Sequence, residues 1–200
     1  MISPFASFAL AIAITLTSIS AAAASESKTG DLLLAVGYSH SEATGLRSDA
    51  AVAASGSPYA GFFGTLAEIG PFGFDLEVSG RILRHDVVET SRTTTLTIPL
   101  VEAGVGVRIP ILPLRSFEVD AIAGGGAAWP IDRTCGPSCP FNDSVPAVTP
   151  YLRGTVEMRL ESLYGLRLSL DHRPNPLWPE TLGATTSLTA ALFWNPTAGL

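Results

Sequence analysis

The three histidines are the residues best suited to acid–base chemistry, and each has a hydroxyl or acidic neighbour in the sequence. His172 lies in LSLDHRPNPLW, three residues after Ser169, and this spacing places the two side chains on opposite faces of a β-strand. His40 stands between two serines, and Asp86 follows His85. Closeness in sequence does not establish a catalytic triad. We therefore expect the histidines to bond locally and predict no catalytic residue.

The only two cysteines, Cys135 and Cys139, lie in the stretch CGPSC. In an exported protein, an even number of cysteines flanking a Gly-Pro turn predicts a disulfide. A metal site would need more histidine or cysteine ligands than lie nearby. The spacing is also one residue longer than that of a C-x-x-C redox motif. The sequence therefore predicts a Cys135–Cys139 disulfide, no metal and no cofactor.

The N-terminus indicates export. Residues 1–24 resemble a secretory signal peptide, with an apolar stretch at Phe8–Leu16 and small residues at Ala21–Ala24; an uncleaved anchor is the alternative. Residues 25–200 then form one domain. The net charge of −6 without a basic run argues against a nucleic-acid partner. Charged residues make up 15% of the chain, against about 25% in typical soluble domains.

The stretch GFDLEVSGRIL shows the pattern that dominates the mature chain. Its even positions are apolar apart from Gly80, and its odd positions include Asp75, Glu77 and Arg81. A period of two is typical of a β-strand with two different faces. Eight such segments predict an all-β barrel: Asp31–Ser39, Tyr59–Ile69, Gly73–Arg84, Thr95–Ile109, Arg115–Ala128, Val148–Leu160, Gly165–His172 and Leu182–Trp194.

Short and long connections alternate between these segments, as in an antiparallel up-and-down membrane barrel with short periplasmic turns. The long links are His40–Pro58, His85–Thr94, Pro130–Ala147 and Arg173–Thr181.

The segment Thr95–Ile109 has a phase conflict: its apolar residues Leu96, Ile98 and Leu100 share the parity of its charged residues. We expect a β-bulge near Pro99 to correct that phase.

The charged residues of the strands decide which face points inward. All their basic members are arginines, and the chain's single lysine, Lys28, precedes the first strand. Arginine–carboxylate pairs suit a narrow interior, because bidentate bonds satisfy buried charge well. The prediction is an inside-out barrel with lipid against the apolar face. The predicted lumen network comprises Asp75, Glu77, Arg81, Glu102, Arg108, Glu118, Asp120, Arg153, Glu157, Arg159, Arg167 and Asp171.

Aromatic residues gather at both ends of the predicted strands, which favours two interfacial belts. The belt beside the short turns comprises Phe72, Phe74, Phe117, Tyr164, Phe193 and Trp194. The belt beside the long loops comprises Tyr38, Tyr59, Trp129 and Tyr151. A closed transmembrane barrel is therefore the predicted fold.

These features resemble the small outer-membrane β-barrel proteins of Gram-negative bacteria, such as the OmpA-type membrane domain and the OmpX-like group. The likeness rests on the signal peptide, the alternating connections, stretches such as IPLVEAGVGVRI and VDAIAGGGAAW, and the aromatic-ended last strand. Members usually end on an aromatic residue read by the outer-membrane assembly machinery, whereas here NPTAGL follows Trp194. The resemblance implies an outer-membrane location, with lipid, lipopolysaccharide and the assembly machinery as partners.

Two other functions remain open from the sequence. One is a soluble exported barrel of lipocalin type that binds a small apolar ligand. The other is a lipid A-modifying enzyme, since some deacylases on this scaffold carry a late His-x-Ser motif; here position 174 is proline. We expect a structural or surface-interaction protein, not an enzyme, whose lumen is filled by charged side chains. The ligand of the external loops is not specified by the sequence.

Overall fold

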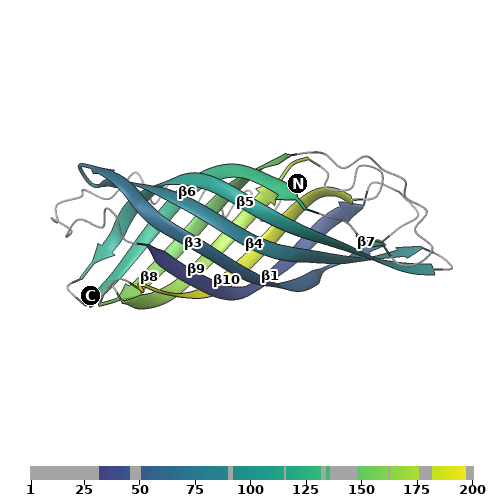
Figure 1. Ribbon diagram of the computed structural model, residues 1–200, viewed down its shortest axis with the longest axis horizontal. Coiled ribbons are helices and arrows are strands. Elements are labelled where there is room, and N and C mark those ends of the chain that lie inside the picture. The colour runs from purple at the N-terminus through teal and green to yellow at the C-terminus, as the bar shows by residue number, and fades with distance from the viewer. Residues whose placement is uncertain are drawn as a thin grey trace, which may run out of the picture.

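The computed structural model describes residues 32–45, 51–89, 92–114, 116–131, 134–135, 148–161, 163–175 and 182–196, which form an antiparallel barrel (Figure 1). Its wall consists of β1 (Leu33–Gly45), β3 (Ser55–Ile69), β4 (Phe72–Glu89), β5 (Arg92–Pro113), β6 (Phe117–Pro130), β8 (Thr149–Leu160), β9 (Tyr164–Arg173) and β10 (Leu182–Trp194). Two short strands, β2 (Ala51–Ala53) and β7 (Thr134–Cys135), add to the outer ends of β4 and β5.

The barrel is closed by the pairing of its first and last strands. β1 pairs antiparallel with β10, and every other wall strand pairs with the wall strands before and after it in the chain. The prediction of a closed up-and-down barrel with eight strands is therefore confirmed. Within the described ranges, no helix has the length and hydropathy needed to cross a membrane.

The two faces of the wall differ in chemistry. Leu76, Val105 and Leu168 face outward with 39%, 64% and 38% of their surface exposed, whereas Glu77 and Arg167 face inward with 6% and 3% exposed. A closed sheet can present such an apolar exterior to lipid, because its backbone groups all pair within the wall. A soluble lipocalin-type barrel has the opposite arrangement, and that alternative is rejected.

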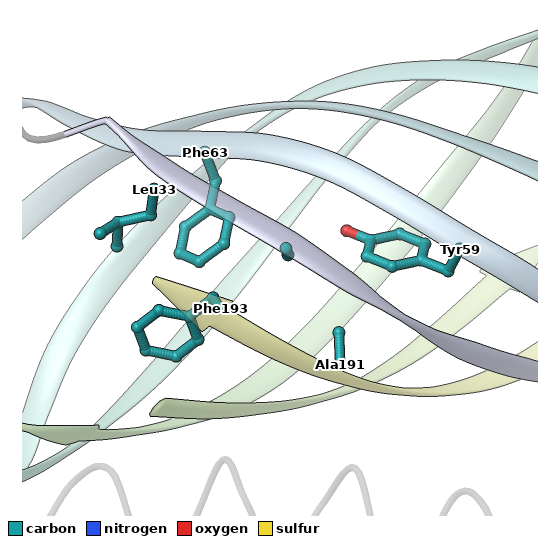
Figure 2. Packing of buried hydrophobic residues seen from close by; sticks show 6 residues of the cluster. Leu33, Tyr59, Phe63, Ala191 and Phe193 are labelled. Carbon is teal, nitrogen blue, oxygen red and sulfur yellow. The ribbon is translucent and has the colours of Figure 1, made fainter. Parts of the chain in front are cut away.

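The end with the short turns is filled by an apolar cluster. Phe63 and Phe193 meet edge to face with ring centres 5.4 Å apart, next to Leu33 (Figure 2). The turn between β3 and β4 is tight because Gly70 adopts a positive φ of 61°, which glycine allows without strain. This inner apolar cluster comprises Leu33, Ala35, Tyr59, Phe63, Ala191 and Phe193.

At the opposite end β4 and β5 continue as one long hairpin beyond their neighbours (Figure 1). Their pairing runs without interruption as far as Glu89 and Arg92. The prediction of a loop at residues 85–94 is therefore wrong for residues 85–89 and 92–94, which belong to β4 and β5. Their inward side chains form an outer aliphatic core made of Leu83, Val87, Leu96, Ile98 and Leu100, with Ala43 and Val52 packed against it.

The outer aliphatic core also explains why the expected bulge near Pro99 is wrong. The register of β4 with β5 shifts nowhere between its two ends, and Pro99 simply pairs with Ile82. Leu96, Ile98 and Leu100 share the inward face with Glu102 because the interior itself changes from charged to apolar. The register shifts of the wall lie elsewhere, for example between Pro110 and Leu112.

The aromatic belts are confirmed only in part. Tyr38, Trp129, Tyr164 and Trp194 are exposed on the outer face, between 39% and 59%. Tyr59, Tyr151 and Phe193 instead point into the barrel, with 5%, 3% and 2% of their surface exposed. Their position near a strand end suggested the belt, but their parity in the strand decides their direction.

Three predictions lie outside the described residues. The predicted signal peptide, residues 1–24, precedes them. Cys139 also falls outside, and of Cys135 only the backbone is described, as part of β7. The signal peptide, the domain boundary after residue 24 and the disulfide therefore stay predictions.

Candidate functional site in the barrel interior

The charged residues of five strands meet inside the barrel. The central charged layer, as we call it, contains six buried arginines and six buried carboxylates. The arginines are Arg81, Arg108, Arg153, Arg159, Arg167 and Arg173, and the carboxylates are Asp75, Glu77, Glu102, Asp120, Glu157 and Asp171. All come from β4, β5, β6, β8 and β9. Because the numbers match, the layer carries no net charge.

Glu102 on β5 is the centre of the part nearer the outer aliphatic core. Its carboxylate accepts hydrogen bonds from Arg81 Nη2 at 2.7 Å, from Arg153 Nη2 at 3.0 Å and from Arg173. Asp171 pairs with Arg81 at 2.9 Å and with Arg153. Charge-assisted bonds of this kind are about twice as strong as neutral ones.

Hydroxyl groups on β1 and β10 accept further hydrogen bonds from these arginines. Arg81 Nη1 donates to Ser39 Oγ at 3.0 Å and to Thr189 Oγ1 at 3.2 Å. Arg173 Nη1 donates to Ser187 Oγ at 3.2 Å. Arg81 thus reaches from β4 to β1 and β10, whereas Arg173 on β9 bonds to the adjacent strand β10 and, through Glu102, to β5.

Glu157 on β8 organises the part nearer the short turns. It accepts from Arg159 Nε at 2.6 Å and from Arg167 Nη1 at 3.2 Å. Asp75 holds Arg108 through Nε at 3.0 Å and Nη2 at 2.7 Å. Arg108 Nη2 also lies 3.7 Å from the Glu157 carboxylate, which links the two pairs.

Glu77 joins the two parts into one network. Its carboxylate accepts from Arg153 on one side and from Arg167 on the other. Tyr59 donates its hydroxyl proton to the same carboxylate at 2.9 Å. Substitution of Glu77 would therefore separate the network at the middle of the barrel.

The two remaining predicted members lie at the edge of the layer. Asp120 is buried, and its carboxylate is 3.9 Å from Arg108 Nη1 and 4.0 Å from Arg159 Nε. Glu118 is half-buried on β6 and faces Arg159 across the strand pair. The interior thus brings eleven of the twelve predicted residues into one connected set of buried ion pairs, with Glu118 beside it.

Aromatic rings flank the arginines from both ends. The guanidinium carbon of Arg167 lies 4.1 Å from the centre of the Phe63 ring, and that of Arg153 lies 4.8 Å from the Tyr151 ring. A cation over a ring face gains about 0.5–2 kcal/mol, more where water is excluded. The inward-pointing aromatics therefore support the charged layer instead of the membrane interface.

Arg173 is the network residue that the sequence did not reveal. It was expected to begin a proline-rich loop, but β9 continues through it and its side chain is fully buried against Glu102. Its parity matches that of Arg167 and Asp171, so the alternation of the strand could have identified it. The prolines that follow hid that signal.

The histidines do not assemble a catalytic site. His172 faces outward, with Nδ1 3.1 Å from Thr186 Oγ1, while Ser169 faces inward and is 2.9 Å from Thr155 Oγ1. His85 is buried inside, and Asp86 is exposed outside. Within the described ranges, no three metal-ligating side chains come together.

Comparison with known proteins supports the fold. No family model and no curated protein matches the sequence. The outer membrane protein OprG from Pseudomonas aeruginosa has a similar structure: the TM-score is 0.51 at 11% identity, over 84% of this chain and 94% of that chain. Ail, the attachment invasion locus protein of Yersinia pestis, crystallised with the heparin analogue sucrose octasulfate, gives 0.43 at 11% identity, over 83% and 99%.

The fold and the inside-out wall together define the class of this protein. It is a closed eight-stranded β-barrel of the outer-membrane type, with an apolar outer face and a charged interior. At 11% identity the likeness to OprG concerns the fold alone.

Proposed function

We propose that the protein is a closed, non-catalytic outer-membrane barrel whose outer end contacts molecules outside the cell. The observation that supports the closed state is the balance of six arginines and six carboxylates across the lumen. Such a layer has no uncompensated charge to attract a permeating ion. Each side chain in it is also held by partners on other strands, so none is free to move alone.

The outer end supports the surface-contact part of the proposal. The β4–β5 hairpin extends past the wall and has its own core, and it therefore presents a firm surface instead of a flexible loop. Arg84 on β4 and His172 on β9 are exposed on the outer face of the barrel, in the outer halves of their strands. Arginine suits phosphate groups, so lipopolysaccharide is the proposed neighbour at this level.

Conductance in planar lipid bilayers tests the closed lumen. We expect the purified wild-type barrel to give no channel steps. A double variant, Glu77→Ala with Arg153→Ala, removes the link between the two parts of the network and is expected to conduct. Arg84→Ala on the outer face is the matched control and should remain silent. Channel steps of the wild-type protein would disprove the proposal.

Mass spectrometry of lipid A tests the non-catalytic part. A strain that lacks the protein should have the same lipid A acyl chains as its parent. The opposite faces taken by His172 and Ser169 support this expectation. A loss or gain of an acyl chain that the restored gene reverses would establish an enzyme instead.

A further inference from the structure

The barrel interior is not filled evenly around its circumference. A void lies between the central charged layer and the wall formed by β5 and β6. Its volume is about 20 Å³. On one side it is lined by the backbone of Gly104, Gly106 and Gly124, and on the other by Glu77 and Arg167.

Gly104, Gly106 and Gly124, which line this void, belong to a group of four glycines that face each other across β5 and β6. Gly104 pairs with Gly126, and Gly106 pairs with Gly124. A Cβ at Gly126 would lie 2.1 Å from the Ala103 carbonyl oxygen, and one at Gly124 would lie 2.2 Å from that of Val105. Larger residues are excluded at these two positions by the neighbouring backbone, and none of the four glycines has a side chain to fill the lumen beside it.

Beside this void, one hydrogen-bond donor of the central charged layer is buried without a partner: the Nε–H of Arg167. Arg167 lines the void, is 3% exposed, and its Nε–H has no hydrogen-bond partner. Its Nη groups are used by Glu157 and Glu77. A buried unpaired donor costs about 1–3 kcal/mol, and more when it is charged. Such groups in folded proteins are commonly satisfied by internal water.

From the void and this donor we infer a binding site for one water molecule between Arg167 and the glycine wall. A single water needs about 10–15 Å³ of such space, so about 20 Å³ holds one. Two arginines, Arg153 and Arg167, and two carboxylates, Asp75 and Glu77, line the void. Because these charges cancel, the site favours a neutral ligand over an ion.

This water gives the closed lumen a hydrated side. On the β1 and β10 side, hydroxyl groups of the protein accept hydrogen bonds from Nη1 of Arg81 and of Arg173. On the β5 and β6 side, a water molecule takes that role, because glycines supply no side chain. The inference goes beyond the proposed function, since a water can occupy this site whether or not the lumen conducts.

Water-to-protein NMR cross-relaxation in lipid nanodiscs tests the site. In the wild-type barrel the glycine α-protons of residues 104, 106 and 124 should show long-lived contacts with water. Gly106→Ala places a methyl group in the void, 2.8 Å from Ile122 Cγ2 and 3.5 Å from the Ala123 carbonyl oxygen, so the Ile122 side chain must shift to admit it. The long-lived contacts between the glycine α-protons and water should then disappear. Gly154→Ala is the matched control, because a Cβ there meets nothing within 4 Å.

The outcomes separate a wet void from a dry one. Absence of water contacts in the wild-type barrel, or their survival in Gly106→Ala, would overturn the inference. Binding of xenon in the wild-type void would overturn it as well, since xenon enters dry apolar cavities. Should Gly106→Ala not fold, hydroxyl-radical footprinting of the wild-type barrel decides instead. Phe63 and Tyr151 are only 1% and 3% exposed, so their labelling requires internal water, and unlabelled rings would refute the site.

Discussion

The central charged layer and the outer aliphatic core share two strands, β4 and β5, and differ completely in chemistry. On β5, Glu102 holds three arginines, whereas Leu100, the next inward residue, belongs to the aliphatic core. On β4, Arg81 and Leu83 mark the same change. Strand parity therefore decides which side chains enter the barrel, but not whether they meet charge or hydrocarbon.

Substitutions in the two layers should also destabilise the barrel in different ways. Each charge in the central layer depends on specific partners, and removal of one partner leaves others buried and unpaired. The aliphatic core depends on shape and volume, so truncation leaves a cavity whose effect is confined to its neighbours. The central layer also joins five strands of the wall, while the outer aliphatic core belongs mainly to one hairpin.

The largest effect is expected from Glu102→Ala. It deprives Arg81, Arg153 and Arg173 of their shared carboxylate, all at 8% exposure or less. Loss of one partner from a buried ion pair costs about 3–5 kcal/mol. Urea unfolding of the barrel in lipid vesicles, followed by tryptophan fluorescence, measures this loss in the free energy of unfolding.

The control for this variant is Glu42→Ala, because Glu42 is an exposed carboxylate on β1. Substitutions at such positions usually change stability by about 0.5 kcal/mol or less. If both variants unfold at the same urea concentration, the charged layer contributes nothing to stability, and the contrast between the two layers disappears.

Ile98→Ala is expected to have the next largest effect, and a more local one. Ile98 is fully buried in the outer aliphatic core, and truncation of such a residue costs about 2–4 kcal/mol. Hydrogen exchange should quicken at the amides of the outer halves of β4 and β5 and stay slow at those of β8 and β9.

The matched control is Thr97→Ala, on the same strand with its side chain toward the other face. It should leave exchange nearly unchanged. Faster exchange throughout the barrel in Ile98→Ala would mean that the hairpin and the wall unfold together, and the distinction between the two layers would then be wrong.

The period of two identified the wall strands because a barrel imposes a strict inside and outside on every residue. Asp75, Glu77, Arg153 and Arg167 are inside, as the alternation predicts, and the exposed leucines and valines between them are outside. Alternation carries this information because neighbouring residues in a strand point to opposite faces.

The sequence could not predict where the interior changes character. Leu96, Ile98 and Leu100 have the inward parity of their strand. A lumen that is charged along its whole length would not contain them, so the sequence suggested a bulge, which the register of β4 with β5 does not have. Arg173 was missed because the prolines after it indicated a loop. Several arginines have partners on strands far apart in the chain, as Arg153 and Glu77 or Arg173 and Glu102 do. Such pairings depend on closure of the barrel, which no local pattern encodes.

The smallest effect concerns His85, the titratable group inside the outer aliphatic core. It lies opposite Leu96 and is fully buried. Burial lowers the pKa of His85 below its usual 6.5, and it outweighs the Ala53 backbone and the Asp86 carboxylate, which both raise that pKa. The unfolded hairpin therefore binds a proton more readily than the folded one. Stability is complete above about pH 6.5 and falls as the pH drops below it, by up to about 1.4 kcal/mol per pH unit.

Hydrogen exchange of the hairpin amides at a series of pH values, corrected for intrinsic exchange rates, measures this loss. His85→Leu should remove the dependence on pH, because leucine fits an aliphatic core and does not titrate. His172→Asn, outside the barrel beside Thr186, should retain the wild-type dependence. A profile that is unchanged in His85→Leu would show that the acid sensitivity of the hairpin comes from another group. The outer aliphatic core would then tolerate a charge as readily as the central charged layer does, and the expected difference between the two layers would be wrong.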